Sequence, residues 1–293
     1  MRPLAYFLGA AALLALAAPR FVAARACGDI DGVGAVPCAC GDVLVGSRTL
    51  SPTDPITRGP CDGDGLIVRI PPSYPGATLN LGGQTISGLG RGIGIHVQSG
   101  GADQLSITGP GVVRAFDVGV LGSGTIRTVE DIVSADHRTN GFCLTGVGFT
   151  VSGCEARDNG RAGFVLRGDG YHVAGNRAVG NGADGFSLTG RGAVVAGTVV
   201  NESAANGAHG MTIAGRNHLV RDVTATGNHA GGLRARIARS AVVAPATSAN
   251  GGLDLSVAGH DSSVDSPTRG ASIRLRGTWL DGQKPTERGK GSR

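Results

Sequence analysis

The segment NGRAGFVLRG at residues 159–168 returns as NGADGFSLTG at 181–190 and as NGAHGMTIAG at 206–215. In each copy an asparagine stands four positions before a glycine, and an apolar residue follows that glycine. The same pair of a glycine and an apolar residue recurs along most of the chain, at Gly94, Gly119, Gly141, Gly163, Gly185, Gly210, Gly232 and Gly252. Successive glycines of this series are separated by steps of 25, 22, 22, 22, 25, 22 and 20. A period of this size indicates a solenoid, in which one structural unit stacks on copies of itself.

A second series of polar residues keeps the period of the glycines, and comprises His137, Asn159, Asn181, Asn206, Asn228 and Asn250. Because asparagine tolerates left-handed backbone and its amide bonds to nearby peptides, we expect a corner of every coil here, with stacked amides. Within each unit apolar residues alternate, as Phe164 and Leu166 do, which predicts short strands. The predicted fold class is therefore all-β, a solenoid with coils of about 22 residues.

The composition agrees with a β protein rich in turns. The chain has 293 residues, of which 52 are glycine and 13 are proline, and 41% are hydrophobic. Glycine does not recur every third residue and prolines are few, which excludes a collagen triple helix. The apolar fraction is too high for a disordered chain, and glycine with β-branched residues disfavours a mostly helical protein. Aromatic residues are scarce, which counts against tight sugar binding on Trp or Tyr faces.

The formal net charge of +5 is concentrated at the chain ends. Three arginines lie within positions 1–26, and without them the balance is 24 minus 22, or +2. Positions 284–293 carry four basic residues and one acid, so residues 27–283 sum to −1. Because this body is nearly neutral, we expect no nucleic-acid partner.

Residues 1–26 are typical of a signal peptide. A positive start at Arg2 is followed by an apolar run from Leu4 to Ala18, and Ala24-Arg25-Ala26 is an A-x-A cleavage pattern. The run is shorter than the ~20 residues of a membrane-spanning helix, and no later stretch approaches that length. We therefore predict a secreted or periplasmic protein without a transmembrane segment. A lipid anchor on Cys27 is the less favoured alternative, because the residues before it fit a lipobox poorly.

Six cysteines follow this leader, in a compartment where disulfides persist, and we predict disulfides among Cys27, Cys38, Cys40, Cys61, Cys143 and Cys154. The first four are expected to staple an N-terminal cap with the first strands at residues 27–75. A bridge between Cys38 and Cys40 is the least plausible pairing, because one intervening residue strains the geometry. Metal binding by this Cys-x-Cys pair is a less favoured alternative. Spacing does not decide whether Cys143 and Cys154 form a third bridge or stay free.

Two segments resemble a known fold. TLNLGGQTI at 78–86 resembles the opening coil, and 159–166 the repeat, of right-handed parallel β-helix proteins of the pectate-lyase-like superfamily. The sequence CACGD at 38–42 is similar to the cap of secreted bacterial β-helix proteins. The resemblance covers roughly residues 43–275. We expect the β-helix at residues 76–282, followed by a basic, flexible tail at 283–293. The resemblance leaves the activity open, because this fold hosts lyases, hydrolases, epimerases and proteins without known chemistry.

One face of the expected helix gathers polar side chains. If the side chain after each repeat glycine points inward, its neighbours along the strand point outward. The polar residues expected to point outward are Arg167, Asp184, His209, Arg234, Arg236 and Asp254. Asp184-Gly185-Phe186 and His209-Gly210 resemble steps of polygalacturonases, but Gly207-Ala208 stands where those enzymes place paired aspartates, so the carboxylate pair for glycoside hydrolysis is absent. Asp184 and Asp254 are about three coils apart, which argues against a shared calcium ion.

The remaining chemistry is proton abstraction beside a carboxylate, as in lyases and C5-epimerases of uronic acids. We expect His209 as the base, Asp184 to orient it, and Arg234 to neutralise the uronate. Substrate binding is expected from Arg167, Arg236 and Asp254. No cofactor and no metal is expected. The predicted function is that of a secreted β-helix protein that interacts with an acidic polysaccharide, as a lyase-like or epimerase-like enzyme.

Two alternatives stay open at this stage. The polar side chains of the expected face are also what the solvated outside of a sheet carries, and the protein is then a non-catalytic extracellular structural or adhesion protein. His137, between Asp136 and Arg138, faintly resembles the Asp-Pro-His of alginate epimerases, but the proline is missing. Since His137 occupies the asparagine position of the repeat, a role at a corner is expected.

Overall fold

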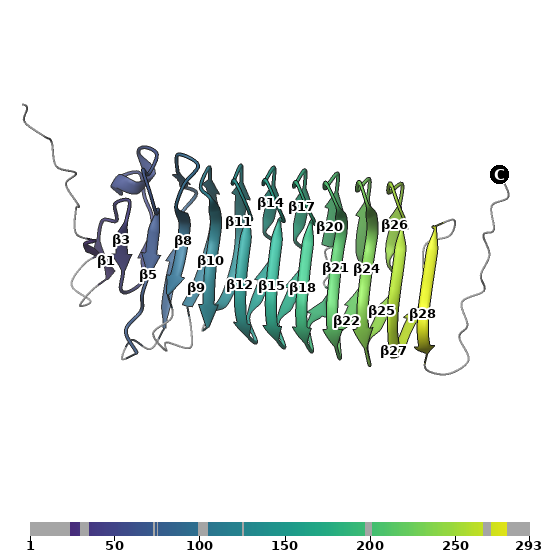
Figure 1. Cartoon of the computed structure of the whole chain (residues 1–293). Coiled ribbons are helices and arrows are strands. Elements are labelled where there is room, and N and C mark those ends of the chain that lie inside the picture. The colour runs from purple at the N-terminus through teal and green to yellow at the C-terminus, as the bar shows by residue number, and fades with distance from the viewer. Residues whose placement is uncertain are drawn as a thin grey trace, which may run out of the picture.

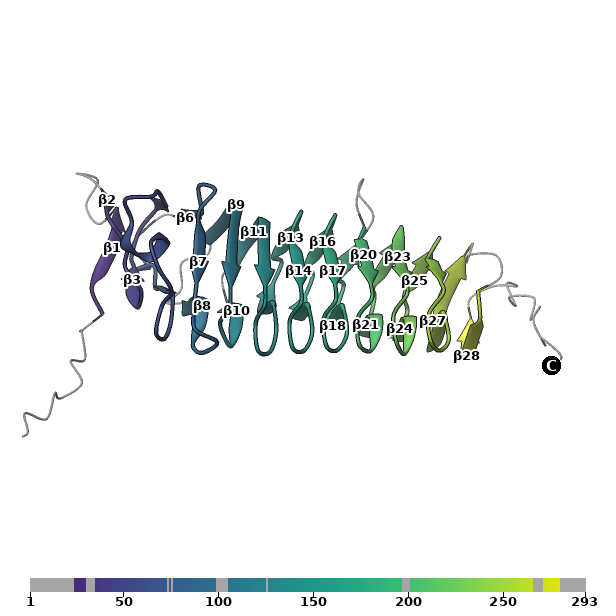
Figure 2. The same ribbon diagram turned by 90° about the horizontal axis from the view of Figure 1, so that it is seen from above.

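The structure is a computed structural model that describes residues 24–29, 35–72, 74, 76–98, 105–124, 126–196, 201–265 and 271–279. The predicted signal peptide lies outside these residues except at positions 24–26, and the predicted tail at 283–293 lies wholly outside them. The described chain forms a row of stacked coils (Figure 1), and seen from above each coil is a narrow loop beside the next (Figure 2). No helix in these ranges is long and apolar enough to cross a membrane.

Strands of successive coils pair in parallel, in three ladders along the row. The first ladder, which we name the front sheet, contains β1 (Ala26–Asp29), β3 (Asp42–Leu44), β5 (Leu66–Val68), β8 (Ile93–Gln98), β10 (Val118–Gly124), β12 (Phe142–Val147), β15 (Phe164–Asp169), β18 (Phe186–Arg191), β21 (His209–Arg216), β24 (Gly231–Ala238), β27 (Leu255–Asp265) and β28 (Ile273–Trp279). The second contains β4 (Arg48–Thr49), β6 (Ala77–Asn80), β9 (Leu105–Arg114), β11 (Ile126–Ala135), β13 (Thr150–Ser152), β16 (His172–Ala174), β19 (Val194–Val195), β22 (Leu219–Arg221), β25 (Ala241–Val243) and the second half of β27.

The third ladder begins at β7 (Thr85–Ser87), includes the second halves of β9 and β11, and continues through β14 (Glu155–Arg157), β17 (Arg177–Val179), β20 (Asn201–Ala204), β23 (Val223–Thr226) and β26 (Ala246–Ser248). In the cap, β2 (Ala35–Val36) pairs antiparallel with β1, and a short 3-10 helix, η1, covers Pro55–Thr57. The predicted all-β parallel β-helix is confirmed, and its coils have the length of the sequence repeat, since equivalent positions of neighbouring repeats pair with each other.

The core is a set of columns in which equivalent residues of successive coils stack inside the helix. The column at the start of the front strands contains Val120, Phe142, Phe164, Phe186, Met211, Leu233 and Leu255. The rings of Phe142, Phe164 and Phe186 are stacked, with centroids 4.8 and 4.6 Å apart. All seven side chains are at most 1% exposed. The apolar residue that recurs in the sequence is therefore the one that recurs in the core of each coil.

The last repeat begins later than the sequence pattern predicts. Leu255, not Leu253, pairs with Leu233, so the coil between them has the usual length and Asp254 stands in the place of the repeat glycine. Asp254 was expected to point outward, and this expectation is wrong, because the residue before an inward leucine lies at the corner of the coil. Its side chain is 8% exposed. The glycine of Gly252-Leu253 falls too early because it belongs to the loop after Asn250.

The asparagine corners form a continuous chain of buried amides. Asn159, Asn181, Asn206 and Asn228 are each at most 2% exposed. The Nδ2 group of each donates to the Oδ1 atom of the next asparagine, at 2.8, 2.9, 3.1 and 2.9 Å, and Oδ1 also accepts the preceding asparagine's backbone N–H. The predicted stacking of amides is therefore confirmed. The left-handed residue of the corner is the one before the asparagine, as Asp158, Gly180 and Ala205 show with φ of 55°, 64° and 51°.

The two ends of this chain of amides differ from its middle. At the N-terminal end, the backbone N–H of His137 donates to Asn159 Oδ1 at 3.1 Å. At the C-terminal end, Asn250 Nδ2 donates to Asp254 Oδ1 at 2.8 Å, and Ser272 N–H donates to Asp254 Oδ2 at 2.9 Å. Burial raises the pKa of Asp254, but hydrogen bonds from Ser272 and Asn250 outweigh it, so the pKa lies below its ordinary value. A carboxylate accepts hydrogen bonds and has no N–H to donate. Asp254 can therefore end the chain of amides without leaving a donor unpaired.

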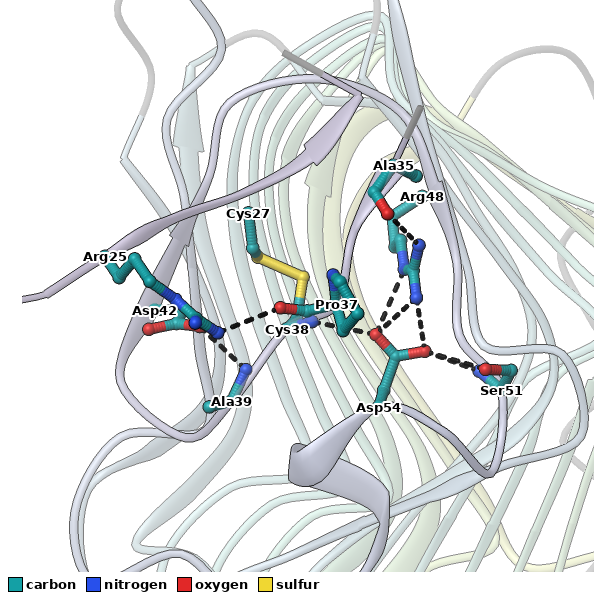
Figure 3. Close-up of a disulfide and its surroundings, with 10 residues drawn as sticks. All are labelled: Arg25, Cys27, Ala35, Pro37, Cys38, Ala39, Asp42, Arg48, Ser51 and Asp54. Carbon is teal, nitrogen blue, oxygen red and sulfur yellow. Dashed lines mark hydrogen bonds and ion pairs between the residues drawn. A yellow bond between two sulfur atoms is a disulfide. The ribbon is translucent and has the colours of Figure 1, made fainter. Parts of the chain in front are cut away.

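The cap closes the N-terminal end of the core. Disulfides join Cys27 to Cys38 and Cys40 to Cys61, which confirms the staple predicted for these four cysteines. Beside the first bridge, the fully buried Asp54 accepts from Cys38 N–H at 2.8 Å and from Arg48 Nη2 at 2.7 Å (Figure 3). Burial raises the pKa of Asp54, but these hydrogen bonds and those from Ser51 N–H and Oγ bring it below its ordinary value. The charge is buried together with its partners, as a stable buried ion requires.

The third disulfide does not form. Cys143 and Cys154, which were predicted among the disulfide cysteines with their own pairing left open, are free thiols. Cys143 lies on β12 between the buried Phe142 and Leu144, so alternation turns its side chain to the outside of the front sheet. Cys154 is 1% exposed and lies in the core just before β14. The wall of the coil therefore separates the two sulfur atoms.

Candidate functional site

The outer face of the front sheet carries the residues that the sequence singled out. Alternation along the strands turns every second side chain outward, and register aligns these side chains in columns across the coils. One column contains Cys143, Val165, Ser187, Thr212, Arg234, Ser256 and Arg274. The next contains Thr145, Arg167, Thr189, Ala214, Arg236, Ala258 and Arg276, and a third contains Val147, Asp169, Arg191, Arg216, Ala238 and His260.

Arginines dominate the charge of this face. We name as the arginine face the seven on these three columns, which are Arg167, Arg191, Arg216, Arg234, Arg236, Arg274 and Arg276. Six of them are exposed and Arg234 is half-buried. Their columns hold one carboxylate, Asp169, so the outer surface of these coils is strongly positive although residues 27–283 together sum to −1.

A salt bridge occupies one of the seven arginines. Arg191 Nε donates to Asp169 Oδ2 at 3.0 Å, and this hydrogen bond holds the pKa of Asp169 below its usual range, with a further contribution from the charge of Arg216. Within the described residues, the other six arginines form no salt bridge with any carboxylate. Their guanidinium groups are therefore open to an external anion.

The structure brings together two of the predicted catalytic residues. Asp184 ends the turn before β18, and His209 is the first residue of β21 in the next coil. His209 Nδ1 lies 3.4 Å from Asp184 Oδ1, and His209 N–H donates to the same oxygen at 3.0 Å. Thr212 Oγ1 donates to Asp184 Oδ2 at 2.8 Å. The side chains of His209 and Asp184 are 25% and 22% exposed, so the pair lies at the surface in a fixed arrangement.

The Asp184–His209 pair has the form of a base and its orienting group. Because Nδ1 faces the carboxylate, Nε2 of His209 is left to exchange a proton with a bound molecule. The carboxylate also has a structural task, since its Oδ1 bonds the next coil in the way that Asn140 Oδ1 accepts from Ala162 N–H at 3.1 Å. The geometry thus suits chemistry and coil stacking alike.

The remaining predicted site residues lie at different distances from this pair along the row. Arg234 stands one coil beyond His209, opposite Thr212, and Arg236 stands opposite Ala214 on the same strand. Arg167 stands one coil before Asp184, opposite Thr189. Asp254 does not join them, because its oxygens bind Asn250 and Ser272 at the last corner. The pair and the three arginines therefore lie on or beside one outer face, and Asp254 does not.

Sequence reasoning missed part of this face. Arg191 and Arg216 end β18 and β21, and Arg274 and Arg276 lie on β28 in register with the outward residues of β27. The pattern Arg-x-Arg at 274–276 repeats that at 234–236, and this repeat is the signal that would have found the last two. The role of Thr212 has no comparable signal, because its bond to Asp184 joins distant positions of the chain. Within the described ranges, no three His, Cys, Asp or Glu side chains gather as metal ligands.

His137 takes the predicted place at a corner. It is 2% exposed; its Nδ1 accepts from Phe116 N–H at 3.1 Å and its Nε2 bonds Val113 O at 3.1 Å. Burial lowers the pKa of His137 to about 4. Both ring nitrogens are thus engaged with backbone, and the imidazole is neutral at neutral pH.

Known structures share this architecture. The chain resembles the A-module of the Azotobacter vinelandii mannuronan C-5 epimerase AlgE6 with a TM-score of 0.51 and 14% identity, over 81% of this chain and 77% of that one. The corresponding module of AlgE4 has a TM-score of 0.49 and 13% identity over 86% and 77%, and pectate lyase Pel9A has 0.35 and 12% over 83% and 78%. No protein-family description and no curated protein matches the sequence. The chain thus has the parallel β-helix fold that it shares with the AlgE6 module.

Proposed function

We propose that this chain is an exported protein that binds an acidic polysaccharide along the arginine face. The observation that carries the proposal is the set of six arginines without salt-bridge partners, among the described residues, on one outer face, where they lie on β15, β21, β24 and β28. Neighbouring coils of a parallel sheet are about 4.8 Å apart, so an extended polymer that carries a carboxylate on each unit can meet several guanidinium groups at once. The planar guanidinium matches a carboxylate with two parallel hydrogen bonds.

Export is supported by the cap. Two disulfides close it, and disulfides persist in extracellular and periplasmic compartments. The predicted leader at residues 1–26 supplies the route. The named activity of the epimerase module with a similar fold fits a uronic-acid polymer as the ligand.

We further propose that the Asp184–His209 pair acts on the bound polymer as a lyase or C5-epimerase. Nε2 of His209 takes the proton from C5 of a uronate ring, and the electron pair left on C5 spreads into the carboxyl group, whose charge Arg234 neutralises. In a lyase the C4–O bond then breaks, a double bond forms between C4 and C5, and the leaving oxygen takes a proton from water. In an epimerase a proton from water returns to the opposite side of C5. In both reactions the hydroxide left from that water takes the proton that His209 acquired, which restores the base.

The binding experiment compares acidic and neutral polymers. We expect the protein to bind alginate or polygalacturonate but not dextran, with an affinity that falls as salt rises, because the contacts are ionic. The double variant Arg234→Ala/Arg236→Ala is expected to lose at least tenfold in affinity. The control is Arg138→Ala/Arg221→Ala, which removes the same charge from exposed positions away from the front strands. Equal affinities of the two double variants would refute the proposed surface.

The activity experiment separates an enzyme from a non-catalytic protein. Incubation with alginate and polygalacturonate is followed by the absorbance of new double bonds and by exchange of the C5 proton in deuterated water. His209→Ala is expected to abolish both signals, whereas His172→Ala, at an exposed position on β16, keeps them. One observation favours the alternative, a structural or adhesion protein. Asp184 Oδ1 accepts a backbone N–H of the next coil as Asn140 Oδ1 does, so Asp184 has a role in stacking the coils without any chemistry. Polymer binding without either signal would select that alternative.

A further inference from the structure

The first described residues belong to the folded cap. Arg25 Nη2 donates to Pro37 O at 3.1 Å and to Asp42 Oδ2 at 3.2 Å (Figure 3). Asp42 is 6% exposed, and its Oδ2 also accepts from Ala39 N–H at 2.8 Å. Arg25 is the one cation that pairs with this carboxylate among the described residues. Without Arg25, a nearly buried carboxylate would lose its cationic partner and keep only the bond from Ala39 N–H.

The backbone around Arg25 is part of the front sheet. Val43 N–H donates to Arg25 O at 2.8 Å, and Ala26 pairs with Val43 as the first residue of β1. Both contacts start the ladder that the disulfide between Cys27 and Cys38 then closes. A chain that began at Cys27 would lack these contacts.

A chain that began at Cys27 would also carry the charge of its new α-ammonium group on a buried residue. Cys27 is 0% exposed, so an α-ammonium group on it would start from a buried residue, and burial disfavours a charged group. Ala24, Arg25 and Ala26 are all exposed, so an α-ammonium on Arg25 stays in water. The disulfide argues against lipidation of Cys27, because the sulfur that would carry the lipid is already bonded to Cys38.

We infer that signal peptidase hydrolyses the peptide bond between Ala24 and Arg25, and that the exported protein begins at Arg25. The sequence Val22-Ala23-Ala24 places small apolar residues at the third and first positions before that bond, as such a cleavage site requires. Hydrolysis consumes one water molecule and leaves a carboxylate on Ala24 and an α-amino group on Arg25. The A-x-A pattern at 24–26 predicts a cut after Ala26 instead, which would remove Arg25.

The test is to export the full chain from a bacterial host and to determine the start of the purified protein by N-terminal sequencing and intact mass. A protein that starts at Arg25 is expected. A start at Cys27, with or without a lipid, would overturn the inferred site. A chain that keeps residues 1–24 would overturn export together with this inference, and would leave the polymer-binding test untouched.

Two pairs of variants make the test sharper. Lysine directly before the scissile bond blocks this type of cleavage, so Ala24→Lys is expected to stop the normal cut and Ala26→Lys is expected to leave it in place. In the exported protein, Arg25→Ala is expected to lower the urea midpoint of unfolding relative to Arg221→Ala. If Arg25→Ala gave a protein of unchanged mass and unchanged midpoint, Arg25 would be absent from the mature chain and the inference would fail.

Discussion

Removing one amide from the middle of the asparagine ladder is expected to destabilise the helix far more than its size suggests. In Asn181→Ala, four hydrogen bonds are lost. Nδ2 of Asn181 donates to Ala156 O at 3.0 Å and to Asn206 Oδ1 at 2.9 Å, and its Oδ1 accepts from Asn159 N–H at 3.2 Å and Nδ2 at 2.8 Å. Asn181 is 1% exposed, so water does not replace these bonds. At about 1 kcal/mol for each bond, the expected loss in the free energy of unfolding is about 4 kcal/mol.

The assay is urea unfolding followed by far-UV circular dichroism, with Asn140→Ala as the matched control. Asn140 also precedes a glycine, but it is half-buried and its side chain makes one hydrogen bond, in which Oδ1 accepts from Ala162 N–H at 3.1 Å. Its replacement is therefore expected to lower the free energy of unfolding by about 1 kcal/mol. If the two variants differed by less than ~1 kcal/mol, the ladder would not stabilise the fold in the way its geometry implies.

Three further outcomes are expected. The pKa of His137 is about 4 in the fold and 6.5 in the unfolded chain, so burial of the neutral ring contributes about 3 kcal/mol to the free energy of unfolding. This contribution is complete above pH 6.5 and is lost as the pH falls towards 4. The variant His137→Asn should therefore flatten this part of a plot of unfolding free energy against pH. A thiol reagent should label the half-exposed Cys143 in the native protein and reach Cys154 only after unfolding, because burial raises the pKa of Cys154 to about 12; rapid native labelling of both would contradict the buried position. Asp184→Asn keeps the acceptor for His209 N–H, so it should preserve stability while lowering the proposed activity at least tenfold; unchanged turnover would remove Asp184 from the chemistry.

The repeat could be found in the sequence because every coil faces the same demands. An inward residue must stack on its equivalent in the next coil, and the corner asparagine must meet another amide, so both positions recur with the length of the coil. The pattern failed at the last coil, where the ladder ends and a carboxylate serves better than an amide. There Asp254 took the position of a repeat glycine, and its predicted place on the outer face was lost with the register.

The corners show a second limit of the pattern. Three corners in a coil need a residue with positive φ, and Gly170, Gly175 and Gly180 supply them in one coil with φ of 65°, 62° and 64°. Elsewhere Asp158 and Ala205 hold the same conformation, since the surrounding coils fix the backbone. The glycine excess therefore indicated turns, but it could not show which corner position was left-handed.

The sequence by itself determined the solenoid, the length of its coils, its inward columns and the cysteine cap, because these depend on spacing along the chain and most of them are repeated many times. Only the tertiary structure decided which polar groups meet. The contacts of Thr212 with Asp184, of Arg25 with Asp42, and the separation of Cys143 from Cys154 depend on single side chains that approach across coils or corners. Such contacts occur once, leave no period in the sequence, and are fixed by how each coil is set upon the one before it.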